Sequence, residues 1–273
     1  MRIWLQKHTV QGRLPLLDTW YREHMDAVAS PGTVVDIKTL PDDAYGDRTP
    51  VDLVQYSALA VMFDDYFGRT AVAAERRGYD AWVIAAGQDP GLVAARTRAA
   101  IPVLGYGETA FHLAAMFGYR FAVVGFNSGL EEPIRENIQR YGLTGRLAAY
   151  EIVGAGSELV HKAMSGDCGP FAESFADAAL RAARKGAQII IPGEGFPNEV
   201  LWHLGIHELH GLPVVDPAGL LVRMAETAVH AGQLGILSRP TTGHRFRRPD
   251  AGVVDHLQEV LLNAMNGKDG ITS

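Results

Sequence analysis

Short apolar runs alternate along the chain with longer stretches in which apolar residues recur every three or four positions. Two of the runs are alike: residues 81–86 (AWVIAA) stop at Gly-Gln-Asp-Pro, and residues 189–191 (III) stop at Pro-Gly-Glu-Gly. Each is followed by a shorter run, at 101–105 and at 212–216, that leads into a helical pattern. Apolar, β-branched runs bounded by Gly and Pro predict buried parallel strands joined by crossover helices.

This repetition predicts two pseudo-symmetric lobes of the α/β class. Each lobe is expected to be a doubly wound parallel sheet, with a cleft between the two. From the positions of the runs we expect residues 1–105 and 216–273 to form a first lobe that holds both chain ends, and residues 106–215 to form a second, inserted lobe. Ligands bind at the carboxyl ends of such strands, so the site is expected at residues 86–89 and 193–196.

The rest of the pattern continues the alternation of strands and helices. Residues 3–5 predict a first strand, and residues 16–29 have the spacing of a helix. Residues 40–51 are polar and rich in Asp, Gly and Pro, and loops of that length often serve as lids or binding loops. A helix is expected over residues 53–76, and a last long helix over residues 218–231.

Composition narrows the class of protein. The chain has 273 residues, is 47% hydrophobic and carries a net charge of −6, which gives no reason to expect nucleic acid or a membrane surface as a partner. No apolar run is long enough for a membrane span or a signal peptide, so we expect a cytoplasmic protein. The single cysteine, Cys168, excludes intrachain disulfides and Cys-rich metal sites.

Residues 84–92 (IAAGQDPGL), 101–105 (IPVLG) and 108–114 (ETAFHLA) carry a family resemblance. They resemble the hydantoin racemase branch of the aspartate/glutamate racemase superfamily, and the likeness extends over most of the chain. The resemblance implies an active site between two α/β lobes, no cofactor, a small-molecule substrate and a homo-oligomer. In that family each lobe contributes one cysteine at its strand end, and the two thiols remove and return a proton on opposite faces of one carbon. Here Ala86 and Gly193 stand at those positions.

Without the thiols, other residues must supply the acid or base. Glu194 lies between two glycines at the end of a buried strand, where burial would raise its pKa toward that of a general acid or base. The alternative is that Glu194 forms a salt bridge or caps the helix that begins near Pro197. Asp89 precedes Pro90, which favours a cap of the following helix over a catalytic role.

His8 is the second catalytic candidate. The family carries the substrate-holding pattern Asn-Pro-Asn-Thr where this chain reads Gln6-Lys7-His8-Thr9, so only Thr9 matches. A histidine at a strand end can move a proton near neutral pH, although the position of His8 favours a structural or purely binding role over proton transfer. Gln6 and Thr9 are expected to bind the substrate, and Lys7 would hold an anion if its side chain points inward.

Further substrate contacts are expected from backbone-rich turns. The loop that opens the helix after residue 105 would offer free amides to a carboxylate, although a plain βα turn is an equal alternative. The strand ends themselves would supply the other contacts. The expected binding residues from these turns are Ala86, Gly87, Gln88, Gly107, Glu108, Thr109, Gly193, Gly195 and Phe196.

Two other groups of residues are weaker candidates. Glu199, His203 and His207 recur every fourth residue and would share one face of a continuous helix, as divalent metal ligands can. Gly205 interrupts that run, and a solvated helix surface is the simpler interpretation. Cys168 lies in a loop beside Asp167, away from both strand ends, which is unfavourable for a reactive thiol.

Together these features predict an enzyme that carries out proton-transfer chemistry without a cysteine pair. The reaction would be that of an isomerase, racemase, lyase or decarboxylase acting on a small carboxylate- or imide-bearing molecule, with Glu194 and His8 as catalytic groups. One alternative is a metal-dependent hydrolase that uses His203 and His207. Another is a non-catalytic protein that binds a small molecule in the same cleft.

Overall fold

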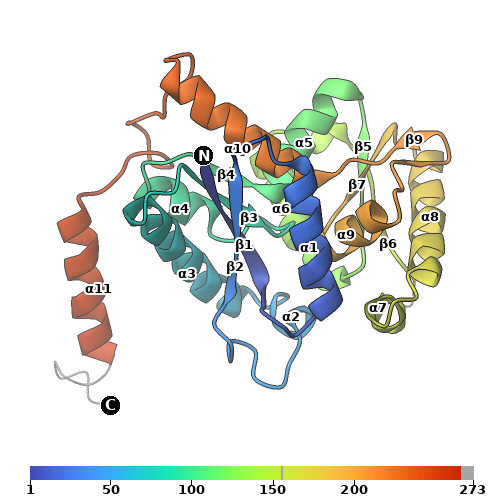
Figure 1. Ribbon diagram of the computed structural model, residues 1–273, viewed down its shortest axis with the longest axis horizontal. Helices are drawn as coiled ribbons and strands as arrows, with labels where there is room; N and C mark the ends of the chain where they lie inside the picture. Colours follow the sequence, from blue (N-terminus) through green and yellow to red (C-terminus); the bar gives the residue numbers. More distant parts are fainter. Residues whose placement is uncertain (155, 266–273) are drawn as a thin grey trace.

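The computed structural model describes residues 1–154 and 156–265 and contains two parallel sheets (Figure 1). The first sheet has the strand order β2-β1-β3-β4 and the second the order β6-β5-β7, which Val214 extends by a parallel bridge to Ile190. The two sheets therefore share one topology, and the predicted α/β class with two lobes is confirmed. The strands are β1 (Arg2–Val10), β2 (Val34–Leu40), β3 (Ala81–Ala85), β4 (Val103–Gly105), β5 (Phe121–Gly125), β6 (Leu147–Ile152) and β7 (Ile189–Pro192).

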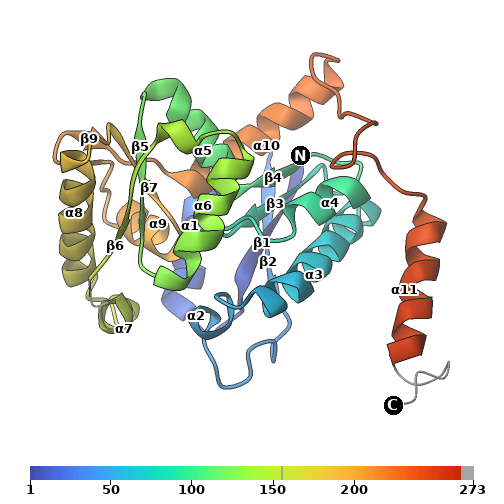
Figure 2. The ribbon, with the colours of Figure 1, turned by 180° about the vertical axis from the view of Figure 1, so that it is seen from behind.

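Helices cover the faces of both sheets (Figures 1 and 2). Those that follow the strands of the first sheet are α1 (Pro15–Val28), α2 (Pro50–Leu53), α3 (Ser57–Arg76), α4 (Leu92–Arg98) and α5 (Tyr106–Phe117). The others are α6 (Glu131–Arg140), α7 (Gly156–Met164), α8 (Gly169–Arg184), α9 (Gly195–His203), α10 (Pro217–Gln233) and α11 (Ala251–Met265). A short antiparallel pair, β8 (Glu208–Leu209) and β9 (Leu212–Pro213), lies between α9 and α10. In both views α11 stands apart from the body of the molecule.

The central strands are buried because they pair on both sides and are covered on both faces. All residues of β3 and β5 are buried, as continuous apolar runs in parallel sheets require. One hydrophobic cluster contains residues of both sheets, such as Leu5 and Val124, together with residues of α1, α9 and α10. The two lobes therefore share a core near the helices that join them.

Three boundaries differ from the sequence-based expectation. Strand β1 runs to Val10, well past residue 5, because it pairs with β2 on one side and β3 on the other. The expected helix over residues 53–76 is divided into α2 and α3, and α10 is followed by a further helix, α11. The lobe boundaries stay a prediction: β4 ends at Gly105, and α10 begins at Pro217. Within the described residues, the helices all lack the length and apolar character of a bilayer span.

Candidate active site

A cleft of about 1180 Å³ opens where the carboxyl ends of the two sheets face each other. The first sheet contributes Lys7, His8 and Thr9 from β1 and residues 85–88 after β3. The second contributes Asn127 after β5 and residues 194–196 after β7. Residues 47–51 of the expected lid loop, and Asp52 after it, also line the cleft. Most residues of the two regions predicted for the site, 86–89 and 193–196, therefore lie around one cavity, and Asp89 and Gly193 do not line it.

The two strand ends meet backbone to backbone beneath this cleft. A Cβ atom on Gly87 would lie 1.7 Å from the carbonyl oxygen of Gly193, so only glycine allows the two turns to approach this closely. Ala86 lines the cleft and is 7% exposed. Gly193 lies behind the cleft wall, against Val123 and Gly125. Neither position carries a group that can titrate.

Glu194 places a carboxyl group at the wall of the cleft while being 6% exposed. Its Oε1 accepts a hydrogen bond from the amide of Asn127, and its Oε2 accepts one from the amide of Phe126, both at 3.2 Å. Burial raises the pKa of Glu194 to about 8, although these two hydrogen bonds lower it. Glu194 is the N-cap residue of α9, but its side chain makes no capping bond, so the cap alternative is wrong. At neutral pH the group is a carboxylic acid that can donate a proton.

Two buried polar atoms in the cleft have no hydrogen-bond partner among the described residues. They are the hydroxyl of Thr9 and the side-chain nitrogen of Asn127, and both residues line the cleft. Buried polar groups are normally paired, so these two atoms are candidates to pair with a ligand once their side chains turn toward the cleft. Thr9 was expected at the site from its sequence. Asn127 was missed, although its position directly after the buried strand β5 was a signal.

His8 lies within β1 and points into an aromatic pocket. Its Nδ1 is 2.5 Å from the hydroxyl of Tyr45, which also donates to the backbone carbonyl of His8 at 2.8 Å. The ring packs edge-on against Phe63 and Phe67. Burial lowers the pKa of His8 to about 4, so the imidazole is neutral at physiological pH. Tyr45, from the expected lid loop, is a second site residue that sequence reasoning missed.

Lys7 is held at the cleft by α1. Its Nζ donates to Asp18 at 2.7 Å and lies 4.4 Å from the ring centre of Tyr21, and the side chain is 2% exposed. Burial lowers the pKa of Lys7, although Asp18 opposes the shift.

Gln6, the residue before Lys7, is fully buried. Its side chain accepts a hydrogen bond from the indole of Trp4 and donates one to the backbone carbonyl of Lys7. Gln6 does not line the cleft, so its expected contact with the substrate has no support in this geometry and stays a prediction.

The glycine loop before α5 already holds a carboxyl group of the chain itself. Asp89 accepts hydrogen bonds from the amides of Gly107 and Glu108, at 2.8 and 2.7 Å, and from the hydroxyl of Tyr141 at 2.8 Å. Gly107, Glu108 and the buried Thr109 do not line the cleft, so their expected role in binding the substrate has no support in this geometry and stays a prediction. Asp89 does cap a helix, but the helix is α5, whereas the residue before α4 is Gly91. The reason is the left-handed backbone of Asp89, with φ of 49°.

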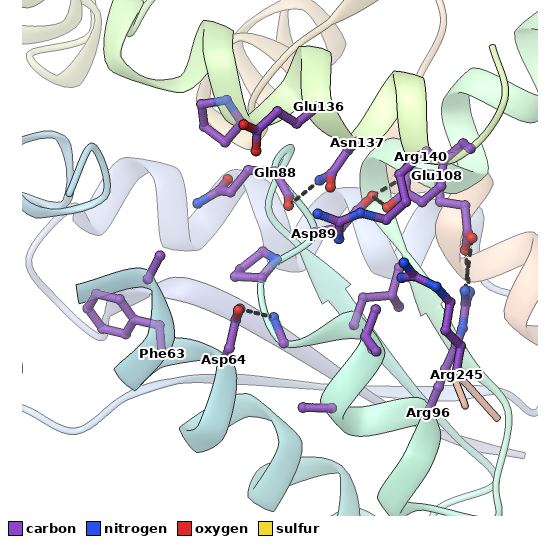
Figure 3. A pocket seen from close by; sticks show the side chains of 18 of the residues that line it. Phe63, Asp64, Gln88, Asp89, Arg96, Glu108, Glu136, Asn137, Arg140 and Arg245 are labelled. Carbon is purple, nitrogen blue, oxygen red and sulfur yellow. Dashed lines mark hydrogen bonds and ion pairs between the residues drawn. The ribbon is translucent and has the colours of Figure 1, made fainter. Parts of the chain in front are cut away.

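A second cavity, of about 460 Å³, lies on the other side of the loop after β3 (Figure 3). Gln88 and His8 line both cavities, so this loop is the wall between them. The carboxylates of this cavity are largely engaged by the protein: Asp64 accepts from the amide of Gly91, and Glu108 forms an ion pair with Arg96. The carbonyl of Gln88 is fixed by Asn137 at 2.6 Å.

The expected metal ligands are not brought together. Helix α9 ends at His203, and Gly205 adopts φ of 67°, so His207 is not on the helix. Glu199 is fully buried and bonds to His24, whereas the ring of His203 stacks on Trp20. Within residues 1–154 and 156–265, no group of three or more His, Cys, Asp or Glu side chains is placed to hold a metal ion.

Cys168 is 5% exposed and its sulfur contacts the carbonyl of Ala163 at 3.8 Å. Burial, followed by the charge of Asp167, raises the pKa of the thiol. Cys168 does not line the cleft. The only cysteine of the chain is therefore a buried thiol away from the strand ends.

Comparisons with known proteins agree with this geometry. The sequence model of a family described as Asp/Glu/Hydantoin racemase matches residues 23–225. A hydantoin racemase from Paenarthrobacter aurescens is 30% identical over 158 residues, which are 56% of this chain and 63% of that protein. The chain thus spans just under two thirds of that relative's length. A hydantoin racemase from Pseudomonas sp. (strain NS671) is 30% identical over 189 residues, which are 65% of this chain and 71% of that protein.

The fold is also found among solved structures. Allantoin racemase from Klebsiella pneumoniae superimposes with a TM-score of 0.70 and 24% identity, over 92% of this chain and 94% of that protein. Such a likeness covers both lobes and the cleft between them.

Proposed function

The chain belongs to the Asp/Glu/hydantoin racemase family, and on that premise we propose that it is an enzyme that moves a proton at an activated carbon without a thiol pair. The substrate is a small molecule that bears a carboxylate or an imide, and Glu194 is the acid. One observation carries the proposal: the buried carboxyl group of Glu194 lies at the cleft, one residue after the position of the second family thiol. Its pKa of about 8 keeps the proton on the group at neutral pH.

The proposed step is protonation of a carbanion or enolate on one face. Loss of carbon dioxide or cleavage of a carbon–carbon bond generates the carbanion, and the proton of Glu194 forms the new C–H bond. The resulting carboxylate is stabilised by the amides of Phe126 and Asn127 until it takes up a proton from water in the cleft. Proton exchange or tautomerisation would start from the carboxylate form of Glu194, whose share grows as pH rises toward 8: it takes the proton from carbon as a base and then returns a proton as the acid.

Donors on both lobes can stabilise the negative charge that develops on the substrate oxygen. The hydroxyl of Thr9 and the side-chain nitrogen of Asn127 lie at the ends of β1 and β5 without a partner among the described residues, and a turn of either side chain would bring a donor to the substrate oxygen. His8 is neutral and held by Tyr45, so we assign it a role in orienting the substrate. We further propose that the enzyme is a homo-oligomer, as the family resemblance implies, and that it acts in the cytoplasm.

The test is solvent deuterium exchange, followed by NMR, on 5-substituted hydantoins, amino acids and substituted malonates. Exchange at the acidic carbon, or deuterium incorporation after loss of carbon dioxide, is expected with the wild-type protein and not with Glu194→Gln. Glu173→Gln, an exposed residue of α8 outside the cleft, is the control. Binding of the same compounds without exchange by the wild-type protein would instead indicate a binding protein.

A further inference from the structure

A buried polar cluster joins α1 to α9 and to the start of α10. His24 of α1 is fully buried, with its Nδ1 3.0 Å from Oε2 of Glu199 and its Nε2 2.8 Å from Oδ2 of Asp216. Asn198 donates to the other oxygen of each carboxylate, at 3.1 Å. Trp202 stacks on the imidazole, with 4.4 Å between the ring centres. His24 and Glu199 do not line the cleft.

The geometry favours an imidazolium in this cluster, since burial raises the pKa of Glu199 but its bonds to His24 and Asn198 oppose that rise. Each ring nitrogen of His24 faces a carboxylate oxygen, so both nitrogens donate only when the ring is an imidazolium. Burial by itself lowers the pKa of His24, but the bonds to Asp216 and Glu199 and their charges raise it to about 9. The other charged group near Glu199 is Lys7, which Asp18 engages, while the phenol of Tyr21 stays protonated. Removing the charge of His24 would leave two buried carboxylates beside each other.

The cluster lies at the junction of the two sheets. Helix α1 follows β1 of the first sheet, and α9 follows β7 of the second. Besides His24, α1 presents Tyr21, whose hydroxyl would be 2.0 Å from a Cβ atom on Gly195. Helix α1 therefore contacts the first turns of α9 at Gly195 and at Glu199. Glu194 directly precedes those turns, so its position depends on how α9 is held.

We propose that His24 is a positioning residue: as an imidazolium bound to Glu199 and Asp216, it fixes α9 against α1 and thereby holds the carboxyl group of Glu194 in the closed wall of the cleft. This inference rests on the proposed function of Glu194. His24 touches no reacting atom. When the link is lost, α9 moves away from α1, water reaches Glu194, and its carboxyl group no longer stays with the amides of Phe126 and Asn127.

The chain offers a matched control for this role. His203 also joins α9 to α1 by stacking, on Trp20 at 4.7 Å, but its ring has no carboxylate partner among the described residues. His24→Gln and His203→Gln therefore both remove an imidazole between the same two helices. Only the first removes the charge between two carboxylates.

The experiment follows the titration of Glu194 by NMR of carboxyl-labelled glutamate, with Glu194→Gln to identify the signal. In His24→Gln the pKa of Glu194 is expected to fall from about 8 by about one unit or more, because water lowers the cost of the charged form. The same variant is expected to lose about tenfold in kcat with KM changed less than about threefold. His203→Gln is expected to change neither quantity.

A second pair of variants covers the case in which His24→Gln does not fold. Glu199→Gln keeps His24 bonded to Asp216 and is expected to shift the Glu194 titration in the same direction by a smaller amount. His24→Gln/Glu199→Gln removes one buried charge of each sign and is expected to fold with the lowered Glu194 pKa. An unchanged Glu194 titration and kcat in these variants, with only a lower melting temperature, would overturn the proposal.

The NMR titration needs no turnover, so it separates two kinds of failure. If Glu194→Gln keeps full activity, the proposed function fails while the titration can still show whether His24 positions Glu194. If Glu194→Gln is inactive and the titration does not respond to His24→Gln, the positioning role alone is wrong.

Discussion

The loops after β3 and β7 occupy equivalent places in the two lobes and differ in where they direct a carboxyl group. Asp89 and Glu194 are each 6% exposed, and burial raises the pKa of both, to about 7 and about 8. Asp89 bonds to the first amides of α5 and to Tyr141, on the side of the second cavity. Glu194 bonds to the amides after β5, at the wall of the interlobe cleft.

This difference gives the cleft one buried carboxylic acid at a strand end. A racemase of the two-base type needs an acid and a base on opposite faces of the reacting carbon. Asp89 is turned away from the cleft by its left-handed backbone, and Ala86 has no titratable group. Proton delivery from one face is the chemistry that this asymmetry supports. The substitutions and the pH dependence below test whether the loop after β7, and not the loop after β3, supplies the catalytic acid.

The largest effect is expected from Glu194→Gln. Loss of the acid should lower kcat by about 100-fold or more, the usual contribution of a positioned general acid. Gln has the same shape and keeps one acceptor, so at pH 4.5 or below, before the carboxyl group begins to lower the stability of the wild type, the free energy of unfolding should change by only about 1 kcal/mol. Kinetics on the substrate found by deuterium exchange, together with urea denaturation, measure both. A large loss of stability with kcat unchanged would identify Glu194 as structural.

The pH dependence of stability should show the raised pKa of Glu194. A carboxyl group with a folded pKa of about 8 contributes stability that is fully present below its ordinary pKa of 4.5 and lost as pH rises toward 8. The free energy of unfolding of the wild type should therefore fall relative to that of Glu194→Gln over this range, by a few kcal/mol. Urea denaturation of both proteins across the range measures the difference. Parallel curves would contradict the raised pKa.

Asp89→Asn should affect stability and leave the chemistry intact. The side-chain amide replaces one acceptor oxygen by a donor, so an amide of α5 or the hydroxyl of Tyr141 loses its partner. The expected cost is about 1 to 3 kcal/mol in the free energy of unfolding, with kcat within about threefold of wild type. Asp177→Asn, at an exposed position of α8, is the control. A loss of kcat comparable to that of Glu194→Gln would mean that both carboxyl groups act in catalysis.

Ala86→Cys should make the two lobes more alike. It adds one sulfur atom at the end of β3, where the side chain already faces the cleft and where the family resemblance places a thiol. A second proton donor on the other lobe should allow delivery to the opposite face, so the product should lose enantiomeric purity. Ala86→Ser adds an atom without an acidic thiol and should not. Chiral chromatography of the product distinguishes the two variants.

The smallest effect is expected from Cys168→Ser. The thiol is buried, outside the cleft, and burial raises its pKa, so it has no part in the proposed chemistry. Activity should stay within about twofold of wild type. A loss of more than about tenfold in a variant that remains folded would show that the thiol participates.

The sequence alone determined the two α/β lobes and the place of Glu194. Apolar runs bounded by Gly and Pro are local signals, and residues 81–86 and 189–191 became β3 and β7 close to where the runs predicted. The position of Glu194 between two glycines at a strand end was likewise visible, because burial of a strand end follows from burial of the strand. These features depend on residues that are neighbours along the chain.

The partners of the polar side chains were decided by the tertiary structure. His24 meets Glu199 and Asp216 across separations of 175 and 192 residues, and no local pattern relates them. Asp89 caps α5 and not α4, and α9 ends at His203, so that His207 lies outside the helix. Both outcomes go with a left-handed backbone conformation, at Asp89 and at Gly205, which the residue pattern did not predict. Periodicity reports which face of an element is buried, but which acid faces the cleft depends on the packing of elements that are distant in the sequence.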